Sequence, residues 1–236
     1  MIVRNTSAES TVHGLLATPV RAAGLNTTVW RRSAGSSRTG GDWCDVVAIA
    51  ADTVAFTVGD VSGHGAGVAG TMATMRTSVL RRIQDIRVPS EILSLANDTA
   101  FNDGDGTIVT AVVAFLNCRQ RTLTFANAGH PPPLLVTGDG QAFLEHLPAD
   151  LPLGIFAKYR AADYVIALPA DAMLVFYTDG ITEHDRDPIR GEMELIEAAR
   201  RAFQRPKVDA AQAIARQLLG THPTLDDAAA MCGRLS

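Results

Sequence analysis

Residues 54–65 have the sequence VAFTVGDVSGHG, and this stretch sets the pattern for the rest of the chain. Its first five residues are apolar apart from one threonine, so they predict a buried strand. Beyond the glycine-rich turn, apolar residues recur at spacings of three and four and predict a helix; they are Val68, Met72, Met75, Val79 and Ile83. Asp60 therefore follows a strand and stands beside a glycine that has no side chain to crowd it.

Aspartates recur at three further points along the chain. They occur in Gly41-Asp42, in Asp179-Gly180 after the apolar run 173–177, and in Asp226-Asp227. Taken singly, an aspartate beside a glycine is typical of a turn. Carboxylates that are spread along the chain and converge only in the fold predict a site for a small, hard metal ion.

The order of the predicted elements favours an α+β fold in layers. Helices are predicted in two pairs, at residues 68–83 and 89–103 and at residues 189–203 and 208–218. Strands are predicted in the hairpins 45–50/54–58 and 108–116/122–126, and at 134–136, 142–144, 164–168, 173–177 and 228–232. Runs of strands with paired helices indicate layers instead of alternating strand–helix units. Residues 1–25 are mixed and polar, and predict a leading helix or a regulatory or edge segment.

The composition is that of a globular protein without special partners. At 236 residues and 47% hydrophobic content, one large domain is the simplest prediction. The net charge of −4, without a long basic stripe, gives no reason to expect nucleic acid. No apolar stretch suits a membrane span, and the N-terminus lacks the apolar core of a secretory signal. The three cysteines lack CxxC spacing, which favours reduced thiols and a cytoplasmic location.

Six motifs occur in a fixed order along the chain. They are GGDWCD at 40–45, GDVSGHG at 59–65, NAGHPPP at 127–133, LPLG at 151–154, YTDGITE at 177–183 and the acidic pair 226–227. Together they closely resemble the phosphatase domain of stage II sporulation protein E and its RsbU-like stress-response relatives. That group belongs to the metal-dependent type 2C (PPM) protein serine/threonine phosphatases. The resemblance covers residues 26–236 and leaves residues 1–25 as a separate N-terminal segment.

The resemblance implies both a fold and a metal centre. The fold would be a four-layer αββα sandwich, with two packed sheets and a pair of helices on each outer face. The centre would hold two divalent cations, Mn²⁺ or Mg²⁺, with Asp60 bridging them. Asp42 and the Val61 carbonyl would bind one ion, and Asp179 and Asp226 the other. Asp227 stays open as an alternative to Asp226.

The resemblance also implies an activity and a partner. The chain would hydrolyse phosphoserine or phosphothreonine by attack of a water bridging the two ions, without a covalent phosphoenzyme. The usual substrate of such enzymes is a phosphorylated STAS-domain anti-sigma-factor antagonist in a partner-switching pathway, and a regulatory protein is a further expected partner. The alternative is a catalytically inactive phosphoprotein-binding module with the same fold.

Other polar residues near these motifs have two interpretations each. Arg38 could bind the substrate phosphate, although the family pattern specifies no arginine there. Asp45 could reach a metal-bound water or cap a turn, and His64 could be a general acid or bond its own loop. His130 is predicted to be structural. Glu183 and His184 could support a metal ligand or lie in a solvated loop.

Three departures from the family pattern bear on shape. Cys44 replaces an aromatic residue, and residues 32–39 lack the usual approach to the Gly-Gly-Asp turn, which predicts flexibility there. Alanines at 228–230 stand where β-branched residues are usual and weaken the last predicted strand.

Overall fold

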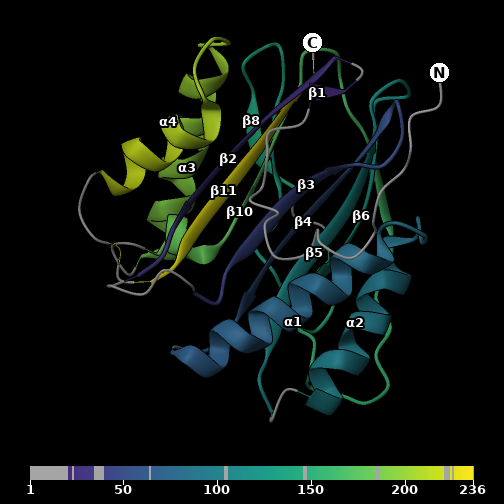
Figure 1. Ribbon diagram of the computed structural model, residues 1–236. Coiled ribbons are helices and arrows are strands. Elements are labelled where there is room, and N and C mark those ends of the chain that lie inside the picture. Colours follow the sequence, from purple (N-terminus) through teal and green to yellow (C-terminus); the bar gives the residue numbers. More distant parts are fainter. Residues whose placement is uncertain are drawn as a thin grey trace, which may run out of the picture.

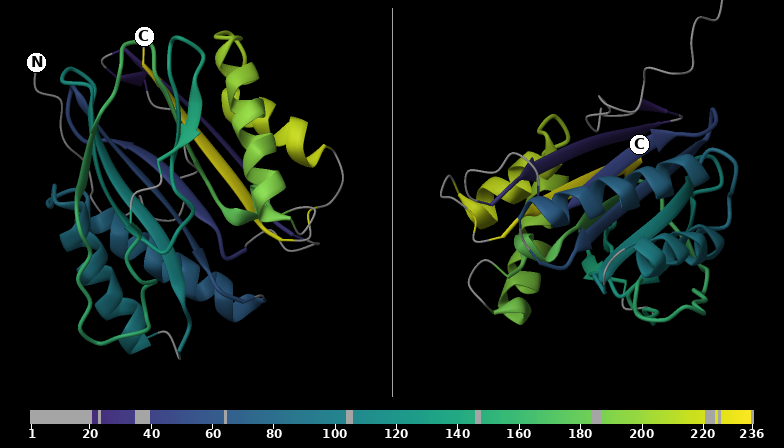
Figure 2. Two further views of the ribbon diagram at one scale, coloured as in Figure 1. Left: turned by 180° about the vertical axis from the view of Figure 1, so that it is seen from behind. Right: turned by 60° about the horizontal axis from the view of Figure 1, so that its bottom comes forward.

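Two antiparallel sheets lie face to face, and each carries a pair of helices on its outer side (Figures 1 and 2). The computed structural model describes residues 21, 22, 24–34, 40–63, 65–103, 106–145, 148–183, 187–220, 224 and 226–235. Its order of layers is helices, sheet, sheet, helices, which confirms the predicted αββα sandwich.

The six-stranded sheet has the strand order β1-β2-β11-β10-β7-β8. Its strands are β1 (Arg21–Ala22), β2 (Leu25–Arg32), β11 (Ala228–Leu235), β10 (Met173–Tyr177), β7 (Leu134–Val136) and β8 (Ala142–Leu144). The five-stranded sheet has the order β3-β4-β5-β6-β9. It consists of β3 (Trp43–Ala48), β4 (Thr53–Val61), β5 (Val109–Asn117), β6 (Thr122–Ala128) and β9 (Tyr164–Ala167).

Helices α1 (Ala66–Arg82) and α2 (Pro89–Asp103) cover the five-stranded sheet, and α3 (Pro188–Phe203) and α4 (Ala210–Leu219) cover the other (Figure 1). Local signals fix their starts. Pro89 opens α2, where its missing N–H costs nothing. The Asp187 and Asp209 side chains accept backbone N–H bonds at the starts of α3 and α4.

The core between the sheets follows from the two-residue period of the strands. In β4, Phe56 and Val58 point inward, and in β10 Leu174 and Phe176 do the same. The Phe56 and Phe176 rings stack across the interface with centroids 5.1 Å apart. Each large apolar side chain fully buried in this way stabilises the fold by roughly 1.5–3 kcal/mol. The same alternation continues to the ends of the strands, so it also decides which of the residues there face the space between the sheets.

Two strands were not predicted as such, the two-residue β1 and the longer β2. β2 carries threonines and arginines in place of an apolar alternation, yet it pairs with β11 over eight residues, from Leu25↔Leu235 to Arg32↔Ala228. β11 is also longer than expected, because it runs on to Leu235. The strand weakness expected from the alanines at 228–230 is therefore offset by pairing on both sides, with β2 and β10. Residues 35–39, most of the stretch expected to be flexible, lie outside the described residues.

Within the described part of the chain, no helix combines the length and the apolar character that crossing a membrane requires.

Candidate metal centre

Asp42 and Asp60 come together at one end of the five-stranded sheet. In the β3–β4 pair Trp43 lies opposite Gly59, which places the preceding Asp42 next to Asp60. The Val61 N–H donates to the Gly41 carbonyl at 3.2 Å and closes this end of the ladder. Asp60 is the next inward position after Phe56 and Val58, so its carboxylate faces the other sheet.

Asp179 and Asp226 come from the facing end of the six-stranded sheet. Asp179 begins a short 3-10 helix, η1 (Asp179–Ile181), directly after β10. Asp226 lies just before β11, which pairs with β10 as far as Tyr177↔Ala230. The two residues therefore lie where the adjacent strands β10 and β11 end and begin.

Glycines allow these segments to approach closely. A Cβ on Gly41 would lie 2.7 Å from the Val61 carbonyl oxygen and 3.0 Å from Asp60 Oδ1. A Cβ on Gly180 would clash with the Asp227 carbonyl oxygen. Glycine beside aspartate is therefore required here by close packing between chain segments and not only by turn geometry.

The carboxylates repel one another in a partly desolvated space. Burial, and then the charge of Asp60, hold the pKa of Asp42 well above its ordinary value. Burial, with the charges of Asp226 and Asp227, raises the pKa of Asp60. Burial, and then the charges of Asp60, Glu183 and Asp226, raise the pKa of Asp179 to about 6. We refer to Asp42, Asp60, Asp179 and Asp226 as the carboxylate cluster.

Asp227, the alternative ligand, already has partners. Its Oδ1 accepts from the Ala34 N–H at 2.8 Å and its Oδ2 from the Gly41 N–H at 2.7 Å. Asp226 is exposed, and its Oδ1 accepts from the Asp227 N–H at 2.8 Å. This arrangement favours Asp226 as the residue with oxygens to offer to an ion.

Asp45 has neither of its two predicted roles. It is 3% exposed and lies on the outer face of β3. Arg76 of α1 binds both of its oxygens, with Nε–Oδ2 at 2.6 Å and Nη2–Oδ1 at 2.8 Å. Arg31 of β2 adds a contact to Oδ1 at 3.3 Å and donates to Cys44 Sγ at 3.3 Å. The cations that satisfy Asp45 come from distant parts of the chain, which local sequence could not indicate.

His130 is structural, as predicted. Its Nε2 lies 3.0 Å from the Tyr177 carbonyl, which can only accept, so Nε2 carries the proton and Nδ1 accepts from Thr110 Oγ1 at 2.8 Å. Asn127 bonds both the N–H and the carbonyl of His130. Burial lowers the pKa of His130 to about 4, which keeps the ring neutral.

Of the other residues singled out from the sequence, three lie outside the described residues and one lies beside the carboxylate cluster. Arg38, His64 and His184 are not among the described residues. Glu183 is exposed, its N–H donates to the Asp179 carbonyl at 2.7 Å, and its charge contributes to the raised pKa of Asp179. It therefore neighbours the carboxylate cluster.

Sequence reasoning missed Thr178. Its hydroxyl donates to Asp42 Oδ2 at 2.6 Å and accepts from the Ala229 N–H at 2.9 Å. A signal was available, because Thr178 continues the inward series Leu174 and Phe176 of β10.

The donor set suits a hard divalent cation. Among the described residues, no three histidine, cysteine, aspartate or glutamate side chains are already close enough to hold a metal ion as they stand. The chemistry of the cluster nevertheless fits one, because it offers only carboxylate and carbonyl oxygens and the charges of its carboxylates repel one another. A bound cation would remove that repulsion and draw the carboxylates together.

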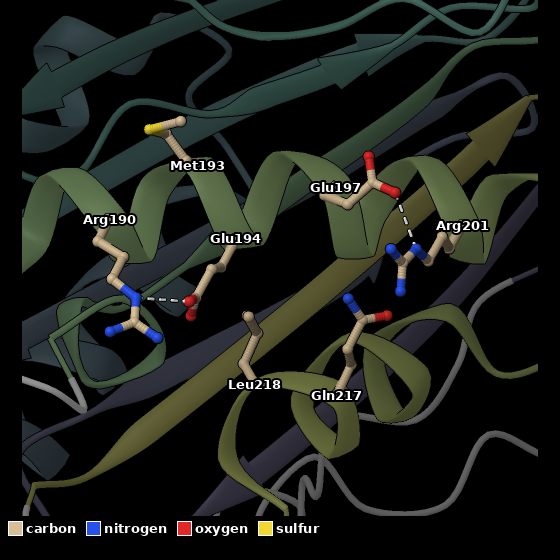
Figure 3. A pocket seen from close by; sticks show the side chains of 7 residues that line it. All are labelled: Arg190, Met193, Glu194, Glu197, Arg201, Gln217 and Leu218. Atoms are coloured by element: carbon tan, nitrogen blue, oxygen red, sulfur yellow. Dashed lines mark hydrogen bonds and ion pairs between the residues drawn. The ribbon is translucent and has the colours of Figure 1, made fainter.

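A surface groove elsewhere contains none of these residues. It runs between α3 and α4 and is bordered by the ion pairs Arg190–Glu194 and Arg201–Glu197 (Figure 3). Its acidic groups are thus paired, unlike those of the carboxylate cluster.

Comparisons with known proteins place the chain in a family. Residues 50–236 match the family model of stage II sporulation protein E (SpoIIE). The chain belongs to the SpoIIE family. Among curated relatives, it is similar to the phosphoserine phosphatases RsbP and RsbU of Bacillus subtilis. It is 24% identical to RsbP over 131 residues (52% of this chain, 32% of RsbP) and 25% identical to RsbU over 133 residues (56% and 40%). This SpoIIE family member thus spans well under half the length of either relative.

Solved structures agree on the fold. The RsbU and RsbW domains of a Mycobacterium tuberculosis protein match 92% of this chain and 61% of that chain, with a TM-score of 0.82 and 27% identity. Two more distant structures contain metal. RsbX in complex with magnesium has a TM-score of 0.71 and 18% identity, and covers 94% of this chain and 100% of its own. The catalytic domain of the phosphatase PstP with two manganese ions has a TM-score of 0.63 and 13% identity, and covers 89% and 98%. At these identities the last two show a shared fold alone.

Proposed function

We propose that this SpoIIE family member is a metal-dependent protein phosphatase that hydrolyses phosphoserine and phosphothreonine. The observation that carries the proposal is the carboxylate cluster, in which aspartates from four chain segments meet at the facing ends of two sheets, and in which burial and neighbouring acidic charges raise the pKa values of Asp42, Asp60 and Asp179. The names of the relatives support the reaction, since RsbP and RsbU are both phosphoserine phosphatases.

The cluster would hold two divalent cations, Mn²⁺ or Mg²⁺. Asp60 would contact both, Asp42 and the Val61 carbonyl would serve one, and Asp179 and Asp226 the other. When bound, the cations would supply an activated water and neutralise charge on the phosphate, whose uncatalysed hydrolysis is extremely slow. The chain's own residues orient the donor oxygens. Gly41 has no Cβ, so the Val61 carbonyl and the Asp60 carboxylate can lie close to it, and the Thr178 hydroxyl holds Oδ2 of Asp42 by a hydrogen bond.

For the substrate we propose a phosphorylated STAS-domain anti-sigma-factor antagonist. Support comes from the similarity to RsbU and RsbP and to a protein that combines an RsbU with an RsbW domain. Dephosphorylation of the antagonist would release it to capture its anti-sigma kinase and so free a sigma factor. Arg38, which lies outside the described residues, is proposed to contact the substrate phosphate.

A paired assay tests the reaction. Turnover of p-nitrophenyl phosphate and of a phosphoserine STAS protein is measured with Mn²⁺ and with EDTA, for the wild type and for Asp60→Asn. Loss of Asp60 should lower the Mn²⁺-dependent rate by more than the roughly 10–100-fold typical of residues that only support metal ligands. Asp52→Asn is a matched control, since Asp52 lies in the turn at the far end of the β3–β4 hairpin and pairs with Arg119.

The outcomes separate the two hypotheses for this fold. Turnover that requires Mn²⁺, persists in Asp52→Asn and is lost in Asp60→Asn supports the enzyme. Binding of the phosphoprotein without turnover of either substrate would instead establish the inactive binding module.

A further inference from the structure

The two halves of the carboxylate cluster belong to different sheets. Asp42 and Asp60 are carried by β3 and β4, whereas Asp179 and Asp226 flank β10 and β11. A site that needs all four oxygen donors at fixed spacing depends on how the ends of the two sheets are held together. At the end that carries the cluster, the side chains of Thr178 and Asp227 reach from the six-stranded sheet to Asp42 and its neighbour Gly41.

Thr178 forms the first link. Its side chain is fully buried, and its backbone is tied to β11 because its N–H donates to the Ala229 carbonyl at 3.0 Å. Its hydroxyl oxygen accepts from the Ala229 N–H at 2.9 Å, so its single proton is available for Asp42 Oδ2 at 2.6 Å. The hydroxyl orientation is thereby set by β11, and the Asp42 carboxylate is oriented in turn.

Asp227 forms the second link. Its two carboxylate oxygens accept the N–H groups of Ala34 and Gly41, the latter immediately before Asp42. Its carbonyl oxygen lies against Gly180, immediately after Asp179. Its own N–H donates to Asp226 Oδ1 at 2.8 Å. One residue thus contacts the neighbours of Asp42 and Asp179 and also Asp226 itself.

We infer that Thr178 and Asp227 are positioning residues that form a clamp between the sheets and set the spacing of the carboxylate cluster. The inference rests on the proposed metal-dependent function and adds residues that do not themselves bind the ions. Such a clamp has a measurable consequence, because loss of groups that orient metal ligands typically weakens metal binding by roughly 10–100-fold.

A threonine series tests the first link. Mn²⁺ affinity is measured by titration calorimetry for the wild type, Thr178→Val and Thr178→Ser. Valine keeps the shape and removes the hydroxyl, so affinity should fall by about 10–100-fold. Serine keeps the hydroxyl and should restore affinity to within about threefold of the wild type. A merely structural role would not produce this rescue, because serine loses the methyl group that valine keeps.

Thr28→Val is the matched control. Thr28 lies in the same sheet, and its hydroxyl likewise accepts a backbone N–H, from Ala211 at 3.0 Å, but it contacts α4 and not the carboxylate cluster. This variant should lose some thermal stability and keep the Mn²⁺ affinity of the wild type.

An aspartate pair tests the second link. In Asp227→Asn the amide oxygen can still accept one of the two backbone N–H groups, so Mn²⁺ affinity should fall less than in Asp226→Asn, which loses a proposed ligand. Equal losses in the two variants would make Asp227 a ligand and overturn its clamp role.

The inference and the proposed function fail in different ways. If the wild type binds Mn²⁺ and Thr178→Val binds it equally well, the clamp is wrong and the proposed function stands. If the wild type binds no Mn²⁺, the proposed function fails and the clamp falls with it.

Discussion

Asp42 and Asp45 lie three residues apart at the start of one edge strand, and the fold treats them in opposite ways. Asp45 faces outward, where Arg76 and Arg31 neutralise it. Asp42 faces inward, where the acidic Asp60 and Asp179 and the neutral hydroxyl of Thr178 act on it. Both carboxylates are largely buried, so the difference lies in the partners that the fold supplies.

The two carboxylates differ in how the fold balances their charge. Where the chain brings its own cations, a buried carboxylate ties elements together, here β3 to α1 and β2. Where a buried carboxylate has further carboxylates as its neighbours, as in the carboxylate cluster, its negative charge is balanced by protons or by ions from solution. The carboxylate cluster should therefore respond to metal and pH, and Asp45 should respond to loss of its arginines.

The largest expected effect comes from removing the main cation of Asp45. Arg76→Gln leaves a carboxylate that is 3% exposed with only the longer contact to Arg31. Breaking a buried ion pair typically costs 3–5 kcal/mol, and the remaining arginine places this case near the lower end, at about 3 kcal/mol. Chemical denaturation measures this loss in the free energy of unfolding.

Arg81→Gln serves as its control. Arg81 is an exposed arginine on the same helix, and its replacement should change the free energy of unfolding by no more than about 0.5 kcal/mol. If Arg76→Gln and Arg81→Gln lower the free energy of unfolding equally, the ion pair between Arg76 and Asp45 does not stabilise the fold more than an exposed arginine does.

Mn²⁺ should have the next largest effect, and it acts on the other side of the sheet. A ligand present at 100 times its dissociation constant stabilises the folded state by about 2.7 kcal/mol, which for a chain of this size raises Tm by about 5 °C. Differential scanning fluorimetry with Mn²⁺ and then with EDTA measures the shift. A Tm that does not respond to Mn²⁺, or that rises equally in Asp60→Asn, would contradict the metal assignment.

Removing a charge from the carboxylate cluster should stabilise the metal-free protein. The pKa of Asp179 is raised to about 6, so the neutral form is favoured in the fold. The stability contributed by the neutral carboxyl is complete below its unfolded pKa near 4 and is lost as pH rises through 6. After allowance for the solvent around this half-buried group, Asp179→Asn should gain about 1–2 kcal/mol at pH 7.5.

The pH dependence of that gain is the decisive part. In EDTA, urea denaturation of both proteins should show the difference shrinking between pH 7 and pH 5, with little left near pH 4. A gain that is independent of pH would mean that charge repulsion at Asp179 is not its cause.

The smallest effect is expected at Arg31. Its side chain is 32% exposed and makes one 3.3 Å contact with Asp45, so Arg31→Gln should cost no more than about 1 kcal/mol. The measurement is the same denaturation as for Arg76→Gln. A loss at Arg31 equal to that at Arg76 would reverse the order of the two cations.

Much of the fold could be predicted because most elements carry their own period. The helices and the strands of the five-stranded sheet follow spacings that local sequence displays. β2 could not be predicted in this way, because its threonines and arginines are stabilised by pairing with β11, which lies roughly 200 residues further along the chain. The structural role of His130 was predictable, but its partners Thr110 and Tyr177 were not.

The candidate site likewise contains some residues that could be predicted from the sequence and others that could not. Asp42, Asp60 and Asp179 stand out because each lies beside a glycine near a strand, and the structure brings them together. Arg76 has no such sequence signal, and Thr178 shows only that it continues the inward series of β10, since each acts on a residue that is distant in sequence. The role of Asp45 could not be predicted for the same reason, because it depends on Arg76 of α1, and the position of that helix is known only from the fold.

The central claim is that the carboxylate cluster binds divalent cations through Asp60. Equilibrium dialysis against Mn²⁺ tests it most directly, by counting ions bound to the wild type, Asp60→Asn and Asp45→Asn, with folding of each variant checked by circular dichroism. We expect about two ions per chain for the wild type and for any folded Asp45→Asn, and weakened, incomplete binding for Asp60→Asn. Saturable binding that is unchanged in Asp60→Asn, or no binding to the wild type, would contradict it.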